Sequence, residues 1–84
     1  MTASRIALNT LSSIINRAAK LYGVGSRAHR LAEQALRELV CGATKYVVNL
    51  SLNEQYRLAV LGFSIELILS EARGKKDLCE VTIR

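Results

Sequence analysis

The sequence has few residues that could build a metal centre or a disulfide framework. Its only cysteines, Cys41 and Cys79, lie far apart and outside any CxxC motif, and its only histidine is His29. One histidine and two cysteines do not make a zinc ligand set within one chain. Small domains that depend on disulfides usually carry more than one bridge. We therefore predict no metal, no cofactor and two reduced cysteines; the alternative is a single disulfide between Cys41 and Cys79.

The sequence also lacks the residue combinations of common active sites. Segment 62–66 (GFSIE) has half of a nucleophile elbow, but no second glycine and no histidine nearby. Segment 23–28 (GVGSRA) fits the letters of a dinucleotide fingerprint, but it follows an amphipathic segment and not a strand. No nucleophile, base and oxyanion hole come together. We expect no enzymatic activity and no small-molecule substrate.

Aromatic residues and long apolar runs are scarce too. Aromatics make up 5% of the chain, which leaves no stacking platform for single-stranded nucleic acid. The longest near-continuous apolar stretch, residues 58–69, is interrupted by Ser64 and Glu66 and is shorter than the roughly 20 residues that span a bilayer. The 50% hydrophobic content excludes a chain that is disordered throughout. We expect a single domain, residues 1–84, with no membrane contact and a cytoplasmic location.

Apolar residues at helical spacing predict three helices, at about residues 5–22, 26–49 and 52–73. Gly23 stands where a helix C-cap glycine belongs, and Ser26 is a candidate N-cap for the second helix. Ser51 and Glu54 match a capping box that opens the third helix. The predicted fold is mainly α, a three-helix domain with a short C-terminal strand or tail.

A second fold remains open. Residues 44–50 have strand propensity, and residues 78–83 alternate between two faces. The alternative is therefore α+β, with strands at about 44–50 and 78–83.

The predicted third helix is apolar on more than one side, and two partner helices in so short a chain can hardly cover it. We therefore expect self-association, as a homodimer or a higher oligomer, through this helix. The residues assigned to that surface are Leu61, Phe63, Ile65 and Ile68.

The net charge of +5 is unevenly placed. Residues 1–32 contain basic residues and no acid, whereas residues 33–84 are balanced. A basic surface of this kind suits phosphate or an acidic protein. The candidate contact residues are Arg17, Lys20, Arg27, Arg30 and Arg37.

Segment 18–24 (AAKLYGV) resembles the first helix and turn of helix-turn-helix DNA-binding proteins. Ala19 is the small residue four positions before the turn glycine, Gly23, and the apolar Val24 follows. The resemblance implies a recognition helix over residues 26–36, with Arg27, Arg30 and Gln34 facing the groove of DNA. Gly25 and His29 depart from the pattern, as an inserted residue and as a polar residue near a normally apolar position.

Two functional hypotheses follow. The first is a small non-enzymatic helical protein-interaction module, such as an inhibitor, adaptor or chaperone-like protein. It self-associates through its third helix and presents a basic N-terminal surface to an acidic partner. The alternative is a regulatory nucleic-acid-binding protein that uses the basic surface of residues 17–37.

Overall fold

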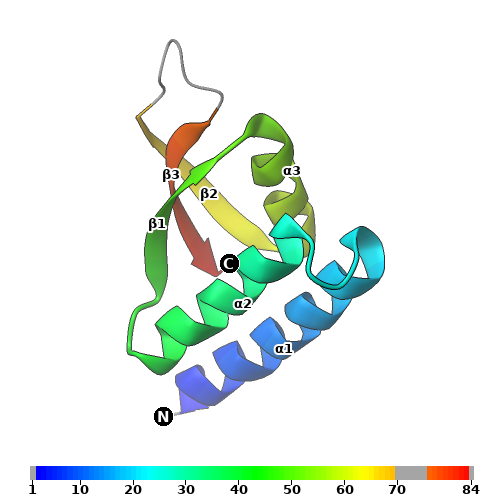
Figure 1. Ribbon diagram of the computed structural model, residues 1–84. Helices are drawn as coiled ribbons and strands as arrows, with labels where there is room; N and C mark the ends of the chain where they lie inside the picture. Colours follow the sequence, from blue (N-terminus) through cyan, green and yellow to red (C-terminus); the bar gives the residue numbers. More distant parts are fainter. Residues whose placement is uncertain (1, 70–75, 84) are drawn as a thin grey trace.

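The computed structural model describes residues 2–69 and 76–83 of the chain. Figure 1 shows the elements in chain order. They are α1 (Thr2–Tyr22), α2 (Arg27–Val40), β1 (Lys45–Leu50), α3 (Leu52–Leu61), β2 (Phe63–Leu69) and β3 (Asp77–Ile83). The mainly α prediction is therefore wrong, and the α+β alternative fits.

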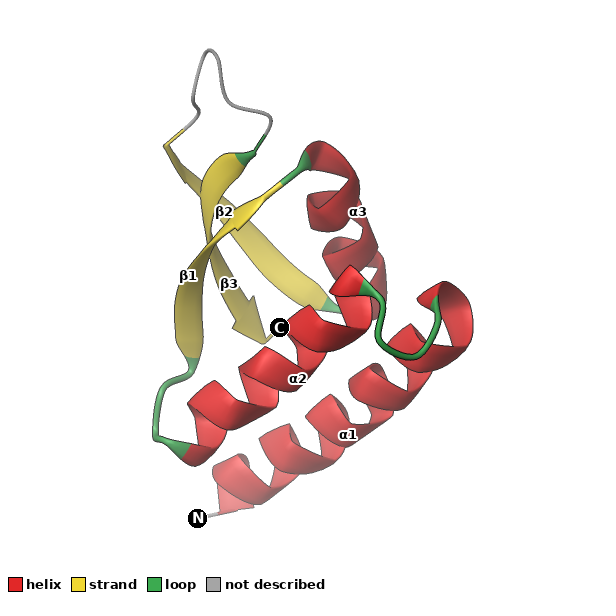
Figure 2. Cartoon of the chain, viewed as in Figure 1, coloured by secondary structure: helices red, strands yellow, loops and turns green. Residues whose placement is uncertain are grey.

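The three strands form an antiparallel sheet in the order β1-β3-β2. Figure 2 shows the helices gathered against one side of this sheet. The burial of β1 agrees, because Tyr46 and Leu50 are buried while Lys45, Val47 and Asn49, which alternate with that face, are exposed. The sheet thus has one covered face and one open face, the usual arrangement of an antiparallel sheet.

The core lies between the helices and the covered face. Leu11 and Ala18 of α1 are fully buried, and so are Phe63 of β2 and Cys79 of β3. The hydroxyl of Tyr46 donates a buried hydrogen bond to the carbonyl of Leu31, at 2.8 Å, and so ties β1 to α2. Such bonds contribute about 0.5–1.5 kcal/mol.

The predicted helix caps are confirmed. The Ser26 hydroxyl accepts from the amide of His29, at 3.2 Å, at the start of α2. At the start of α3 the Ser51 hydroxyl accepts from the Glu54 amide at 3.1 Å, and the Glu54 carboxylate accepts from the Ser51 amide at 2.9 Å. Local sequence is sufficient here because each cap satisfies backbone donors within one turn.

The second helix is shorter than predicted. It ends at Val40 and not at residue 49, and Gly42 follows with a φ of 94°. The apolar pattern misled because Tyr46 and Leu50 are four residues apart, a spacing that puts them on one face of either a helix or a strand. Pairing of β1 with β3 decides between the two. The prediction of a strand at about 44–50 is confirmed by β1, and that at about 78–83 by β3.

The predicted third helix, 52–73, is also wrong. Helix α3 ends at Leu61, and Gly62 after it adopts the left-handed conformation with a φ of 116°. The chain then continues into β2, a strand that the sequence did not predict. Residues 70–73 of the predicted helix lie outside the described residues. The β-branched and aromatic residues after Gly62 fit a strand, and β3 supplies its partner.

Candidate functional site

The described residues form neither a metal-binding cluster nor a membrane-spanning helix. Within residues 2–69 and 76–83, no group of three or more His, Cys, Asp or Glu side chains is placed to hold a metal ion. Among the same residues, no helix has the length and apolar character needed to cross a bilayer.

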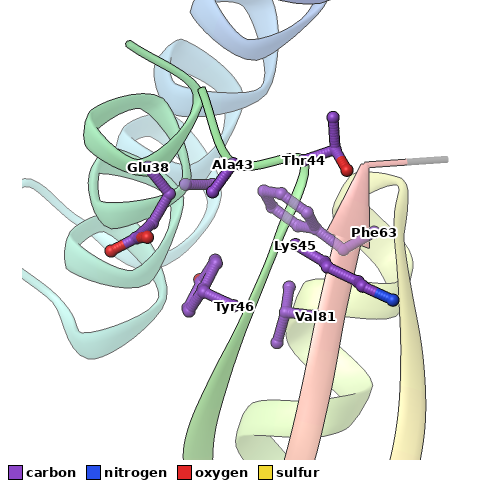
Figure 3. A pocket seen from close by; sticks show the side chains of 8 residues that line it. Glu38, Ala43, Thr44, Lys45, Tyr46, Phe63 and Val81 are labelled. Carbon is purple, nitrogen blue, oxygen red and sulfur yellow. The ribbon is translucent and has the colours of Figure 1, made fainter. Parts of the chain in front are cut away.

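A small gap lies between the C-terminal end of α2 and the covered face of the sheet. Figure 3 shows Tyr46, Phe63 and Val81 among the residues around it. The gap has no room for a water molecule. Burial raises the pKa of Tyr46 well above its usual value, so this phenol stays neutral and serves as a hydrogen-bond donor. The gap is a packing feature and not a ligand site.

A larger open groove, of about 420 Å³, runs between α1 and α2. Ser12, Ile15 and Asn16 line it from α1. Glu33, Leu36 and Arg37 line it from α2. Ile15 and Leu36 also pack against the core, so they form an apolar floor beneath a polar rim.

The five predicted basic contact residues do not form one surface. Arg27 turns to α3, where its Nε lies 3.3 Å from the Glu54 carboxylate. Arg17 lies about 200° round α1 from the groove residue Ile15, so it points away from α2.

The other three basic residues share the outer side of the α1–α2 pair. Arg37 lines the groove. Arg30 lies two turns before it on α2, and Lys20 lies one turn after Asn16 on α1. None of the three forms an ion pair with a described residue.

The arrangement of α1 and α2 differs from that of a helix-turn-helix. The two helices lie side by side and run in opposite directions (Figure 1), whereas helix-turn-helix motifs cross at about 90–120°. Ala28, Leu31, Ala32 and Ala35 of α2 are buried against the rest of the chain. Arg30 is exposed, but Gln34 is only half-exposed and Arg27 is engaged by Glu54. The structure thus offers no support for residues 26–36 as a recognition helix.

The four residues predicted for self-association are separated by the fold. Leu61 and Phe63 are 1% and 0% exposed, so they belong to the core of the single chain. Ile65 is partly buried, and Ile68 is half-exposed at an irregularity in β2. They share no helix face because Gly62 ends α3 before Phe63.

An exposed apolar face lies instead on the outer side of α3. Leu52, Tyr56 and Val60 are 77%, 70% and 46% exposed and lie four residues apart, and Ala59 beside them is exposed. The inner side of α3 holds the buried Leu58 and Leu61. The sequence signal was present, since an apolar stripe through Leu52, Tyr56 and Ala59 follows helical spacing. Only the helix end at Leu61 separates this stripe from the buried residues that follow it.

The charged residues of α3 make contacts within the chain. Glu54 lies within ion-pair distance of Arg27 and of Lys76, whose Nζ is 3.8 Å away. The guanidinium of Arg57 lies over the Tyr22 ring, 4.9 Å from its centre, a cation–π arrangement. The outer face of α3, defined as Leu52, Tyr56, Ala59 and Val60, is therefore free of charge.

Comparisons with models of protein families, with curated protein sequences and with solved structures found no match to this chain.

Proposed function

We propose that this protein is a non-enzymatic interaction module that self-associates through the outer face of α3. It presents a basic surface, made of Lys20, Arg30 and Arg37, to an acidic partner. The observation that carries the proposal is the outer face itself. A short helix exposes Leu52, Tyr56 and Val60 while its opposite side is buried. Contiguous apolar patches of this kind mark interaction sites on small proteins.

The size of the chain supports association. A domain of this length buries a smaller fraction of its unfolded-chain surface than a larger domain does, and its margin of stability is narrow. A standard interface covers about 800 Å² of each partner, roughly one seventh of the 5554 Å² surface of the chain. Exposed aromatic residues such as Tyr56 are typical anchors of such interfaces.

The symmetry of the stripe favours a second copy as the occupant. In an antiparallel pair of α3 helices with Tyr56 on the two-fold axis, Leu52 of one copy lies across from Val60 of the other. The charged residues of α3 are engaged within the chain, since Glu54 lies near Arg27 and Lys76 and Arg57 lies over the Tyr22 ring. Arg30 and Arg37, which form no ion pair with a described residue, lie on α2 and not on α3, so these like charges do not face one another across the contact.

The test is the mass of the protein as a function of concentration, by sedimentation equilibrium. We expect a reversible dimer whose dissociation constant rises about tenfold or more with Tyr56→Glu, because a carboxylate is then buried in the contact. Asn49→Glu is the matched control, since it adds the same charge at an exposed position of β1, and it should change the constant less than about twofold. A wild-type chain that stays monomeric at high concentration would contradict the proposal, as would equal effects of the two variants.

Nucleic-acid binding is the second candidate, because Lys20, Arg30 and Arg37 form no ion pair with any described residue. Such binding would weaken steeply with salt. Fluorescence anisotropy with a labelled DNA duplex and a labelled RNA, at low and high salt, tests it. Binding that is lost with Arg37→Glu and kept with Tyr56→Glu would support this candidate.

A further inference from the structure

We infer that the groove between α1 and α2 binds an acidic amphipathic helix of a partner protein. This inference rests on the acidic-partner part of the proposed function and names the site and the form of that partner. Four observations support it: the apolar floor, the apolar residues that extend it, the unequal rims, and the antiparallel arrangement of the two helices.

The apolar floor is longer than the groove itself. Val40 follows Leu36 by one turn of α2, and Leu8 precedes Ile15 by two turns of α1. Because the helices are antiparallel, both additions fall at the same end (Figure 1). Val40 is 73% exposed and Leu8 is 37% exposed. Together the four residues form an apolar line about 10 Å long, enough to receive two turns of a helix.

The two rims of the groove differ in charge. On the α2 side Arg30 and Arg37 stand seven residues apart, and neither pairs with a described acid. Glu33 lies between them, with a carboxylate oxygen 3.9 Å from Nδ1 of His29. On the α1 side the groove is lined by Ser12 and Asn16, which are uncharged, and Lys20 lies one turn beyond Asn16. A ligand that fits this surface therefore carries most of its carboxylates along the flank that faces α2.

A helix is the form of ligand that the groove fits best. Two antiparallel helices present ridges and grooves into which a third helix packs, and an apolar stripe laid in a groove is a common mode of recognition. Guanidinium groups bind carboxylates through paired hydrogen bonds. A nucleic acid fits less well, since the apolar floor of Ile15 and Leu36 offers nothing to a phosphate backbone.

The test uses a labelled synthetic peptide of about 18 residues, or five helical turns. It carries leucines along one stripe and glutamates along one flank. One control peptide has the same composition in shuffled order, and a second has lysine in place of glutamate. Fluorescence anisotropy should show binding of the patterned acidic peptide alone. Amide chemical-shift changes should map to residues 8–20 and 30–40.

Two arginines provide matched variants. Arg37→Glu and Arg17→Glu change the charge equally, and both side chains are exposed and unpaired among the described residues. Only Arg37 lines the groove. We expect Arg37→Glu to weaken peptide binding about tenfold or more and Arg17→Glu to weaken it less than about threefold. Val40→Ser, at an exposed position, should also weaken binding.

Several outcomes would overturn the inference: no binding of the patterned peptide, equal binding of the shuffled peptide, equal losses with the two arginine variants, or shifts confined to α3. Binding of a DNA duplex to the same residues in preference to the peptide would overturn it too. Sedimentation of the same variants separates this result from the proposed self-association, because Arg37→Glu should leave the mass unchanged while Tyr56→Glu should leave peptide binding unchanged.

Discussion

Replacing Gly62 with alanine tests the boundary that separates α3 from β2. In the structure Gly62 has a φ of 116° and caps α3 in the left-handed conformation. A left-handed non-glycine residue costs about 1–2 kcal/mol. The added methyl group would meet Cδ1 of Ile14 at 3.7 Å, an ordinary contact, so backbone strain is the whole penalty.

The sign of the effect distinguishes the two folds. If residues 52–73 formed one helix, Gly62 would lie in its interior, and Gly62→Ala would stabilise the protein by about 1 kcal/mol. The structure predicts a loss of about 1–2 kcal/mol instead. The difference of about 2–3 kcal/mol far exceeds the uncertainty of a difference between variants under matched conditions.

Two other glycines calibrate the experiment. Gly23 has a φ of 101° and Gly42 a φ of 94°, with no atom within 4 Å of an added Cβ at either position. Gly23 ends a helix in both folds, so Gly23→Ala should destabilise whichever fold is right. Gly42 lies inside the wrongly predicted helix 26–49 but in the turn before β1 in the structure. Gly42→Ala should therefore stabilise the protein if the helix is right and destabilise it if the structure is right.

Urea unfolding followed by far-ultraviolet circular dichroism gives the free energy of unfolding for each variant. The reasoning requires losses for all three substitutions and no gain in helical signal. A gain in stability or in helical signal for Gly62→Ala or Gly42→Ala, alongside a loss for Gly23→Ala, would refute the assignment of a left-handed turn at that position.

Three further predictions concern buried or capping groups. Because burial raises the pKa of Tyr46 in the folded state, its stabilising contribution is complete below the usual tyrosine pKa of about 10 and is lost as the pH rises through the folded-state value. The free energy of unfolding should thus fall more steeply above about pH 10 in wild type than in Tyr46→Phe, and parallel curves would contradict this. Ser51→Ala removes the hydroxyl of a capping box and should cost about 1 kcal/mol in urea unfolding, whereas an unchanged midpoint would show that the cap contributes nothing. Cys41 is exposed and Cys79 is buried, so a thiol reagent should label Cys41 at once and Cys79 only when the protein unfolds, and equal labelling rates would place Cys79 at the surface.

Local interactions account for what the sequence predicted correctly. Helix α1, the turn at Gly23 and the caps at Ser26 and Ser51 all depend on residues within about one turn of one another. Strands β1 and β3 were an open alternative because their side chains suit a sheet, but strand propensity is weak until a partner is present. Strand β2 was missed because its apolar residues also continue a helical pattern from α3.

The candidate surfaces, too, were predicted from the sequence only in part. The sequence by itself determined the excess of positive charge in residues 1–32 and the surplus of apolar residues near α3. Only the tertiary structure decided which of these charged and apolar side chains face solvent. It buries Leu61 and Phe63, engages Arg27 with Glu54, and leaves Tyr56 and Arg37 exposed. The physical reason is that exposure depends on the packing of α3 against the sheet and of α1 against α2, which are contacts between segments distant in the sequence.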